Sequence, residues 1–434
     1  MSLKLKTAAD RNSRPHAGDF GEVAVVIPTK NAGQEFPLLL SKLRMQKNVG
    51  QLEIIIVDSG SSDSTVDIAR RFGCKIIRIQ SSEFTHAFAR NRGADAASPA
   101  SRALLFMVQD ALPSTDLWLH EMMQFLYNHS KDDLVALSCV EFPRHDSDLF
   151  YNFLIYRHYN HRGFLNKDRI FKWDGRSPTL IKKRGRLSNI ACLIKRDVFE
   201  KYKFREDFAE DIDLAQRLLK DGRRVACLSS VKVIHSHRRP PFYFLKRRFV
   251  SSTVLEGLKK PSMGEKFDSV EDYFASICNL FHIICALSHR MRHLENGMGG
   301  ERLCSFVLTE IVQAIVRGKK KKIDDKHEWR ELEDEKLTSF IRCLSRHKRE
   351  RATSANFLVQ KFLATFISAH RFINRTYSVP DLRILSEYRG LLVKLACAVA
   401  GEGLGQLYLR WSQKEAYQGM MTRMRSVLIK DVLN

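Results

Sequence analysis

Apolar runs of strand length alternate with helical patterns over the first quarter of the chain. The strand-like runs cover residues 23–28, 52–57, 75–79 and 103–108, and the helical segments between them cover 36–45, 64–72 and 86–97. The run from Val23 to Ile27 is unbroken and rich in β-branched residues, which is typical of a strand buried on both faces of a parallel sheet. Three successive β-α-β units predict an α/β fold whose mainly parallel sheet carries helices on both faces.

The pattern changes beyond about residue 255, where Leu, Ile and Phe recur at spacings of three and four. Such spacing predicts helices, so we expect a flexible basic tail over 1–20, an α/β domain over 21–255 and an α-helical domain over 256–434. The sequence gives no role for the helical domain. Its most apolar stretch, 273–287, contains Ser, Asn and His and is shorter than the roughly 20 residues that span a bilayer.

The chain is strongly basic, with 72 Lys and Arg against 49 Asp and Glu and a formal charge of +23. Such a protein is attracted to nucleic acid, to nucleotide phosphates or to an anionic membrane surface. No helix-turn-helix, zinc-finger or ribonucleoprotein pattern supports nucleic acid. Nine scattered cysteines without a CxxC pair, and a polar N-terminus, predict reduced thiols and a cytoplasmic location.

Polar side chains follow three of the predicted strands. They are Pro28-Thr29-Lys30-Asn31, Asp58-Ser59-Gly60 and Gln109-Asp110. Ligands of parallel α/β sheets bind at the carboxyl ends of the strands, so these residues predict a binding site. Helix capping accounts for Asp63 or Ser64 without any ligand, but it does not account for Asp58, the first residue after an apolar strand.

Two further groups carry candidate chemistry later in the chain. Glu210 and Asp211 begin a predicted helix over 211–220, where acidic residues are also favoured by the helix dipole alone. His235 and His237 follow a strand over 231–234 and flank one serine, so both point to the same side. Each group is a weak signal by itself.

The order of these features is more specific than any one of them. The informative segments are 25–31, 56–65, 88–93 and 209–214. Together they resemble the family 2 inverting glycosyltransferases, whose fold is the Rossmann-like GT-A fold, over roughly residues 23–250. Within that family, Phe84-Thr85-His86, residues 108–113 and the two histidines resemble the rhamnosyltransferase-type members.

The resemblance implies roles for individual residues. Those it assigns to the nucleotide sugar are Pro28, Thr29, Asn31, Asp58, Asp63, Arg90, Gln109 and Asp110, with Asp58 reading the pyrimidine and Arg90 beside the base and phosphates. It makes Asp211, with Glu210 beside it, the general base that deprotonates the acceptor hydroxyl. It makes Asp110 and His235 the metal ligands, with His237 as the alternative histidine.

The activity that the resemblance implies is inverting transfer from dTDP-rhamnose or a UDP-sugar to a hydroxyl of a glycan or lipid-linked acceptor. It also implies surface polysaccharide synthesis at the inner face of a membrane. Basic and aromatic residues interleave over 238–249, a pattern that suits contact with a membrane interface. Oxygen ligands with imidazole suit Mn²⁺ or Mg²⁺. Gln109 and Ala111 replace carboxylates of the family's metal motif, so we expect modest metal affinity. The alternatives are a non-catalytic nucleotide-sugar-binding relative and a basic nucleic-acid-binding protein.

Overall fold

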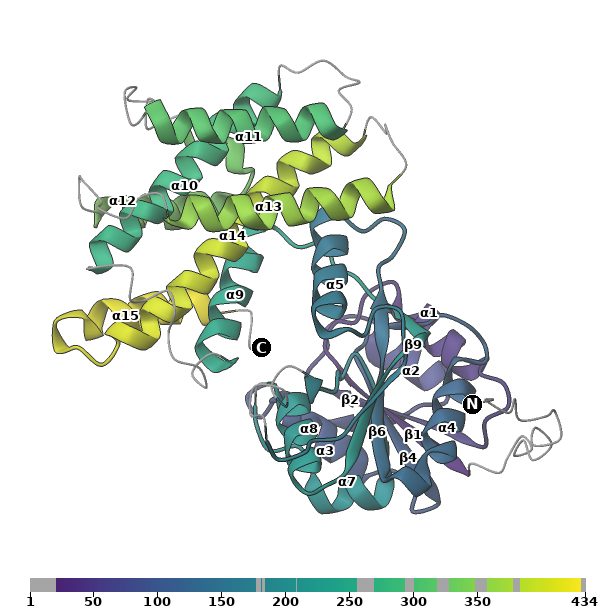
Figure 1. Cartoon of the computed structure of the whole chain (residues 1–434). Coiled ribbons are helices and arrows are strands. Elements are labelled where there is room, and N and C mark those ends of the chain that lie inside the picture. The colour runs from purple at the N-terminus through teal and green to yellow at the C-terminus, as the bar shows by residue number, and fades with distance from the viewer. Residues whose placement is uncertain are drawn as a thin grey trace. The chain divides into compact units, whose positions relative to one another are not determined.

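The computed structural model describes residues 21–176, 181, 184–207, 209–255, 269–292, 300–317, 328–347, 357–377 and 383–430 (Figure 1). The tail predicted over 1–20 lies outside the described residues. The chain divides into two compact units. One unit comprises 1–145 and 155–236, and the other comprises 146–154 and 237–434.

The first unit is built on a nine-stranded mixed sheet in the order β3-β2-β1-β4-β8-β6-β9-β5, with β7 paired to β9. The strands are β1 (Glu22–Thr29), β2 (Leu52–Asp58), β3 (Lys75–Arg78), β4 (Ser101–Met107), β5 (Leu112–Pro113), β6 (Leu134–Phe142), β7 (Arg169–Phe171), β8 (Ala191–Lys195) and β9 (Arg224–Ile234). The ladders β3-β2-β1-β4 and β6-β9 are parallel, and β8 is antiparallel to both of its neighbours. The predicted α/β sheet is confirmed.

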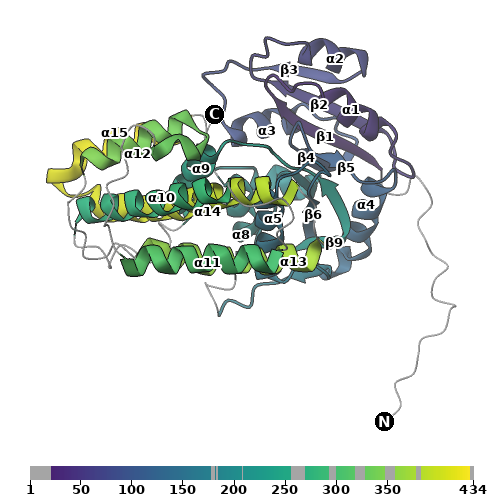
Figure 2. The same cartoon turned by 90° about the horizontal axis from the view of Figure 1, so that it is seen from above.

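Helices cover both faces of this sheet, as the sequence predicts (Figure 2). Their bounds are α1 (Phe36–Arg44), α2 (Thr65–Arg71), α3 (His86–Asp95), α4 (Trp118–Asn128), the short 3₁₀ helix η2 (Ser130–Asp132), α7 (Arg196–Tyr202) and α8 (Glu210–Lys220). Alternate residues of β1 separate the two faces. Val23, Val25 and Ile27 pack with α1 and α4, whereas Ala24 and Val26 pack with α3, α7 and α8.

Two local features decide how the site is positioned. Gly93 lets α3 lie close to β1 and β2, because a Cβ there would collide with Val26 and Val57. Strand β8 begins only at Ala191, so it does not include Asn189. Asn189 instead forms a turn, with its backbone and side chain bonded to the start of α8.

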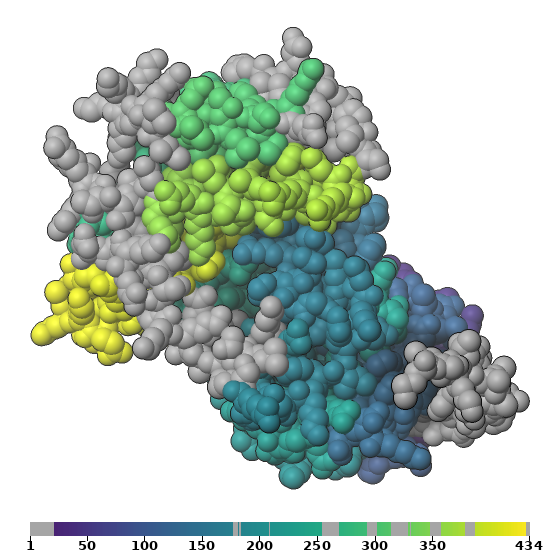
Figure 3. Space-filling model, viewed as in Figure 1, coloured from purple at the N-terminus to yellow at the C-terminus, as the bar shows by residue number. Residues whose placement is uncertain are grey.

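The second unit is helical. Its elements are α9 (Pro241–Leu255), α10 (Val270–Met291), α11 (Gly300–Arg317), η4 (Glu328–Leu332), α12 (Glu335–Arg346), α13 (Phe357–Thr376), α14 (Arg383–Trp411) and α15 (Glu415–Ile429), while α5 (Leu149–Arg162) runs from this unit into the first. In Figure 3, α13 lies beside α11. The sequence places α9 with the preceding domain, which ends at 255. In the structure α9 packs along α14, where Gly401 leaves room for the backbone of Leu245.

Two helices of this unit, Val270–Met291 and Glu387–Trp411, are long and apolar enough to cross a membrane. The first contains the stretch over 273–287 and is longer than the sequence suggests, because it continues at both ends to 22 residues. Most of each apolar window is buried in the protein, 78% and 83% respectively. Core helices of soluble proteins have the same properties, so this is weak evidence for a membrane span.

Candidate active site

The loops after β1 and β2 are joined by side chain to backbone hydrogen bonds. Asn31 has a positive φ of 49°, which Asn tolerates better than most residues. Its Oδ1 accepts from the Ser62 N–H at 2.8 Å, and its own N–H donates to Ser61 Oγ at 2.9 Å. The buried Asp58 carboxylate accepts from the N–H groups of Gly60 and Ser61. These two residues therefore shape the predicted nucleotide loop.

The loop after β4 joins the same edge through Gln109. Its Oε1 accepts from the Lys30 N–H at 2.9 Å, and its Nε2 donates to the Lys30 carbonyl at 3.3 Å. Pro28 pairs with Val57, and Thr29 is buried with its carbonyl accepting from Ser59. The predicted residues from the ends of β1, β2 and β4 are thus brought together.

Asp63 has a local structural role. One of its carboxylate oxygens accepts from the Thr65 N–H and hydroxyl at the start of α2, and the other accepts from the Gly33 N–H at 3.4 Å. The hydrogen bond from the Thr65 hydroxyl is the main cause of its lowered pKa. Its assignment to the nucleotide sugar stays a prediction.

Helices α3 and α8 are joined by a buried ion pair. Arg90 Nη1 donates to Glu210 Oε1 at 2.7 Å, and both side chains are almost fully buried. Asn189 Nδ2 donates to the same oxygen at 2.8 Å. In the structure, Glu210 therefore accepts hydrogen bonds from Arg90 and Asn189, whereas the sequence analysis groups it with the catalytic residues. Among the described residues, Arg90 Nε has no hydrogen-bond partner.

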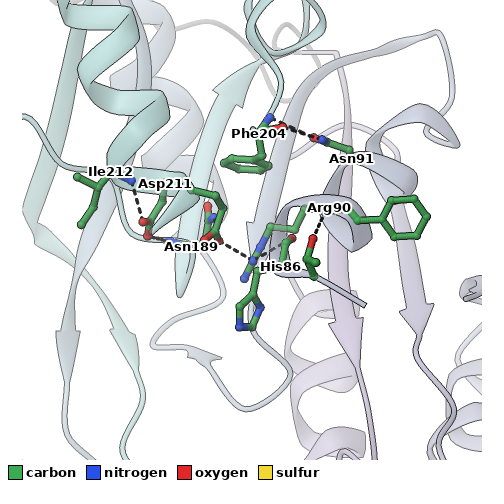
Figure 4. Close-up of polar contacts among 10 residues, drawn as sticks. His86, Arg90, Asn91, Asn189, Phe204, Asp211 and Ile212 are labelled. Atoms are coloured by element: carbon green, nitrogen blue, oxygen red, sulfur yellow. Dashed lines mark hydrogen bonds and ion pairs between the residues drawn. The ribbon is translucent and has the colours of Figure 1, made fainter. Parts of the chain in front are cut away.

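Asp211 follows Glu210 at the start of α8, and Figure 4 shows it beside Asn189 and Ile212. Its Oδ2 accepts from the Asn189 N–H at 3.1 Å and its Oδ1 from the Ile212 N–H at 2.8 Å. Burial and the nearby Glu210 charge raise the pKa of Asp211 to about 6, against the opposing effects of these N–H groups and Arg90. A carboxylate with this pKa is a better general base near neutral pH than an ordinary one.

Two arginines provide positive charge near Asp211. Burial, and then repulsion from Arg186, lower the pKa of Arg162 to about 9, while attraction to Asp211 acts in the opposite direction. Burial also lowers the pKa of Arg186, again against attraction to Asp211. Cationic side chains beside a carboxylate favour the binding of an anionic group next to the base.

Asp110, His235 and His237 form a candidate metal centre. Each offers one ligand atom, and these atoms lie within 4.8 Å of one another. Burial lowers the pKa of His235, but hydrogen bonds to Asp110 and Glu141 outweigh it and raise the pKa to about 9. One carboxylate and two imidazoles fit a divalent transition ion such as Mn²⁺. The structure thus groups both histidines that the sequence offers as alternatives.

The loops that carry Asn31, Asp58, Gln109, Asp110, Asn189 and His235 lie at one edge of the sheet. Met107 of β4 pairs with Ala191 of β8. Gln109 lies two residues after Met107 and Asn189 two residues before Ala191, so both lie just beyond this pair. Leu112 of β5 pairs with Ile234 of β9, which brings Asp110 near His235. The edge is the carboxyl end of β1, β2 and β4, as the topology rule predicts.

The sequence analysis does not single out Glu141, Arg144 or Asn189. Glu141 accepts from His235 Nδ1 at 3.0 Å, and Arg144 donates to the Asp110 carbonyl at 2.8 Å. Each of the three lies next to the end of an apolar strand. The rule that selects Asp58 and Asp110 would also have selected Glu141 and Arg144, at the carboxyl end of β6, but not Asn189, which precedes β8.

Comparison with known proteins identifies the family. The sequence profile described as Glycosyl transferase family 2 matches residues 24–202. The O-antigen chain rhamnosyltransferase WbaN of Salmonella anatum is 30% identical over 230 residues, which are 52% of this chain and 69% of WbaN. RfbN of Salmonella typhimurium, with the same description, is 28% identical over 233 residues, which are 52% of this chain and 70% of RfbN. The chain belongs to glycosyltransferase family 2 and is a glycosyltransferase, so the resemblance is confirmed.

One solved structure is similar to this chain at a low level. The mannosyltransferase PcManGT from Pyrobaculum calidifontis, described in complex with GDP-Man and Mn²⁺, is 15% identical. The match covers 93% of this chain and 91% of that one, with a TM-score of 0.43. A likeness at this level has no bearing on the chemistry of the site.

Proposed function

We propose that this glycosyltransferase is metal-dependent and inverting, and that it transfers a deoxyhexose such as rhamnose from a nucleoside-diphosphate sugar. The acceptor is a hydroxyl of a glycan or a lipid-linked glycan in surface polysaccharide synthesis, at the cytoplasmic face of a membrane. The matches to two O-antigen rhamnosyltransferases support the class of sugar and pathway. The basic character of the chain suits a donor diphosphate and an anionic membrane surface.

The observation that carries the proposal is the common sheet edge shared by the Asp211 carboxylate and the Asp110 centre. Inverting transfer needs a base for the acceptor hydroxyl and charge stabilisation for the departing diphosphate. Asp211 has a raised pKa and is fixed by the N–H groups of Asn189 and Ile212. Its carboxylate takes the acceptor proton as the hydroxyl attacks the anomeric carbon from the face opposite the diphosphate.

The remaining parts of the site bind and orient the donor. The loops of Asn31 and Asp58 hold the nucleotide, and Asp110 with the two histidines would hold Mn²⁺ or Mg²⁺. When bound, such an ion neutralises the negative charge of the diphosphate. Arg162 and Arg186 add positive charge beside Asp211. No group of the protein acts as a nucleophile in this mechanism.

The experiment is a donor screen with the purified chain. We expect release of nucleoside diphosphate from dTDP-rhamnose or a UDP-sugar, with Mn²⁺ or Mg²⁺ present and not with EDTA. Asp110→Ala should remove the metal-dependent turnover and weaken nucleotide binding measured by calorimetry. Asp116→Ala is the matched control, because the Asp116 side chain forms an exposed ion pair with Lys47 and exposed pairs contribute little to stability.

Three outcomes would contradict parts of the proposal. Equal turnover with metal and with EDTA would show that the enzyme does not depend on a metal. Binding of a nucleotide sugar without turnover on any donor and acceptor tested would indicate a non-catalytic relative. Turnover with GDP-sugars alone would exclude the proposed donors.

A further inference from the structure

The segment from Glu141 to Arg144 runs beside the histidine segment because β6 and β9 are parallel and end together. Glu141 pairs with Val233 and Phe142 with Ile234 in the sheet register. Beyond the last pair, the His235 N–H donates to the Phe142 carbonyl at 3.0 Å. The two segments are therefore held in register past the end of the sheet.

Arg144 of this segment contacts both parts of the candidate metal centre, through its side chain and its backbone. The Arg144 guanidinium donates to the Asp110 carbonyl at 2.8 Å and pairs with Glu35. The Arg144 N–H donates to Ser236 Oγ at 3.3 Å, between the two histidines. The segment thus ties the loop of Asp110 to the histidine segment.

Glu141 makes the contact with the clearest chemical consequence. Its Oε2 lies 3.0 Å from His235 Nδ1, and the two side chains are only 12% and 6% exposed. A carboxylate only accepts, so Nδ1 carries the proton and donates it to Glu141. The other nitrogen, Nε2, faces Asp110 Oδ1 at 3.5 Å. Tyr159 donates its hydroxyl to Glu141 Oε1 at 3.3 Å and fixes the carboxylate in turn.

We infer that Glu141 is a positioning residue for the metal centre, an inference that rests on the proposed metal dependence. By holding a proton on Nδ1, it directs coordination to Nε2 of His235 and orients the ring toward Asp110. Carboxylates behind metal-bound histidines typically contribute about 10–100-fold to metal affinity. With one carboxylate in the ligand set, this chain depends strongly on such support.

The test measures Mn²⁺ binding alone, without nucleotide or turnover, from the electron paramagnetic resonance signal of free Mn²⁺. Glu141→Ala should raise the Mn²⁺ dissociation constant by about tenfold or more. Glu141→Gln keeps a carbonyl acceptor and should fall between Ala and wild type. Phe142→Ala is the matched control, because Phe142 contacts His235 through its backbone carbonyl and the residue is 52% exposed.

A spectroscopic readout separates positioning from general damage. The electron spin echo of Mn²⁺ bound to wild type should show nitrogen coupling from an imidazole ligand, and this coupling should weaken in the Glu141 variants while their melting temperatures stay close to wild type. Should Glu141→Ala fail to fold, Tyr159→Phe provides a second variant, with a smaller loss of affinity expected.

Two results would overturn the inference in distinguishable ways. If wild type binds Mn²⁺ with nitrogen coupling and both Glu141 variants bind it within about twofold, the metal centre stands and the role of Glu141 is wrong. If wild type binds no Mn²⁺ at all, the proposed metal dependence fails and the inference fails with it.

Discussion

The two halves of the candidate site are held together by different interactions. In the nucleotide half, which we define as the loops of Asn31, Asp58 and Gln109, side chains bond to the backbone of a neighbouring loop. In the catalytic half, defined by Arg90, Glu210 and Asp211 with Asn189, the central contact is a buried ion pair beside a second carboxylate.

This difference predicts different sensitivities. A typical hydrogen bond contributes about 0.5–1.5 kcal/mol to stability, so single losses in the nucleotide half are tolerated. Removing one partner of a buried ion pair leaves an uncompensated charge and costs about 3–5 kcal/mol. The raised pKa of Asp211 also makes the catalytic half the part that responds to pH.

The largest expected effect is on catalysis at Asp211. Asp211→Asn keeps the shape of the side chain but cannot accept the acceptor proton, so transfer should fall by about 10²–10⁴-fold. Donor affinity, measured by calorimetry on the same protein, should stay near wild type. Asp213→Asn is the matched control in the same helical turn, because Asp213 pairs with Arg217. Transfer at the wild-type rate by the Asp211→Asn variant would exclude Asp211 from the mechanism.

Breaking the buried pair should produce the largest loss of stability. Arg90→Met leaves Glu210 charged and buried, and the free energy of unfolding should fall by about 3–5 kcal/mol in urea titrations. Adding Glu210→Gln removes that charge while its carbonyl still accepts from Asn189 Nδ2, so much of the loss should be recovered. Additive losses in the double variant would show that the two side chains are not coupled.

The third prediction concerns pH. Transfer needs ionised Asp211, so its rate should fall by about tenfold per pH unit below the Asp211 pKa of about 6. The folded pKa exceeds the ordinary value of 3.8, so the folded state holds more protons between these values. The stabilising contribution of this group is therefore present at low pH and is lost as the pH rises through about 6. A rate that is flat between about pH 4.5 and 7 would contradict the assignment.

The smallest effect is expected in the nucleotide half. Asn31→Gly keeps the positive φ but removes the acceptor for the Ser62 N–H, so the free energy of unfolding should fall by about 0.5–1.5 kcal/mol. Asn31→Asp retains an acceptor oxygen and should lose less. If Asn31→Gly lost as much stability as Arg90→Met, the nucleotide half would be as sensitive to a single lost contact as the catalytic half.

The sequence predicts the nucleotide half better than the catalytic half, for a physical reason. Apolar runs and their order specify β1 to β4, and parallel strands necessarily bring their carboxyl ends to one edge. The pairing of Arg90 with Glu210 spans 120 positions and depends on β8 entering antiparallel beside β4. No local pattern contains that information, and the contacts of Asn189 depend on the same insertion.

The grouping of α9 with the later helices has a similar origin. The sequence of α9 does not indicate which helix it packs against. That helix is α14, some 150 residues later. Only the glycines at 401 and 405, where a Cβ would collide with α9, mark the contact in the sequence.

The reactivity of the buried thiols can be used to measure how often the protein unfolds locally. None of the nine cysteines, which all lie within the described residues, forms a disulfide, and Cys343 on α12 is the exposed one among them. Burial holds the pKa of Cys192 in the central sheet well above its usual range. Alkylating reagents need an accessible thiolate, so they should modify Cys343 in the native protein and spare Cys139, Cys192 and Cys227. The rate at which those three thiols are modified would therefore report how often the sheet that supports the candidate active site opens.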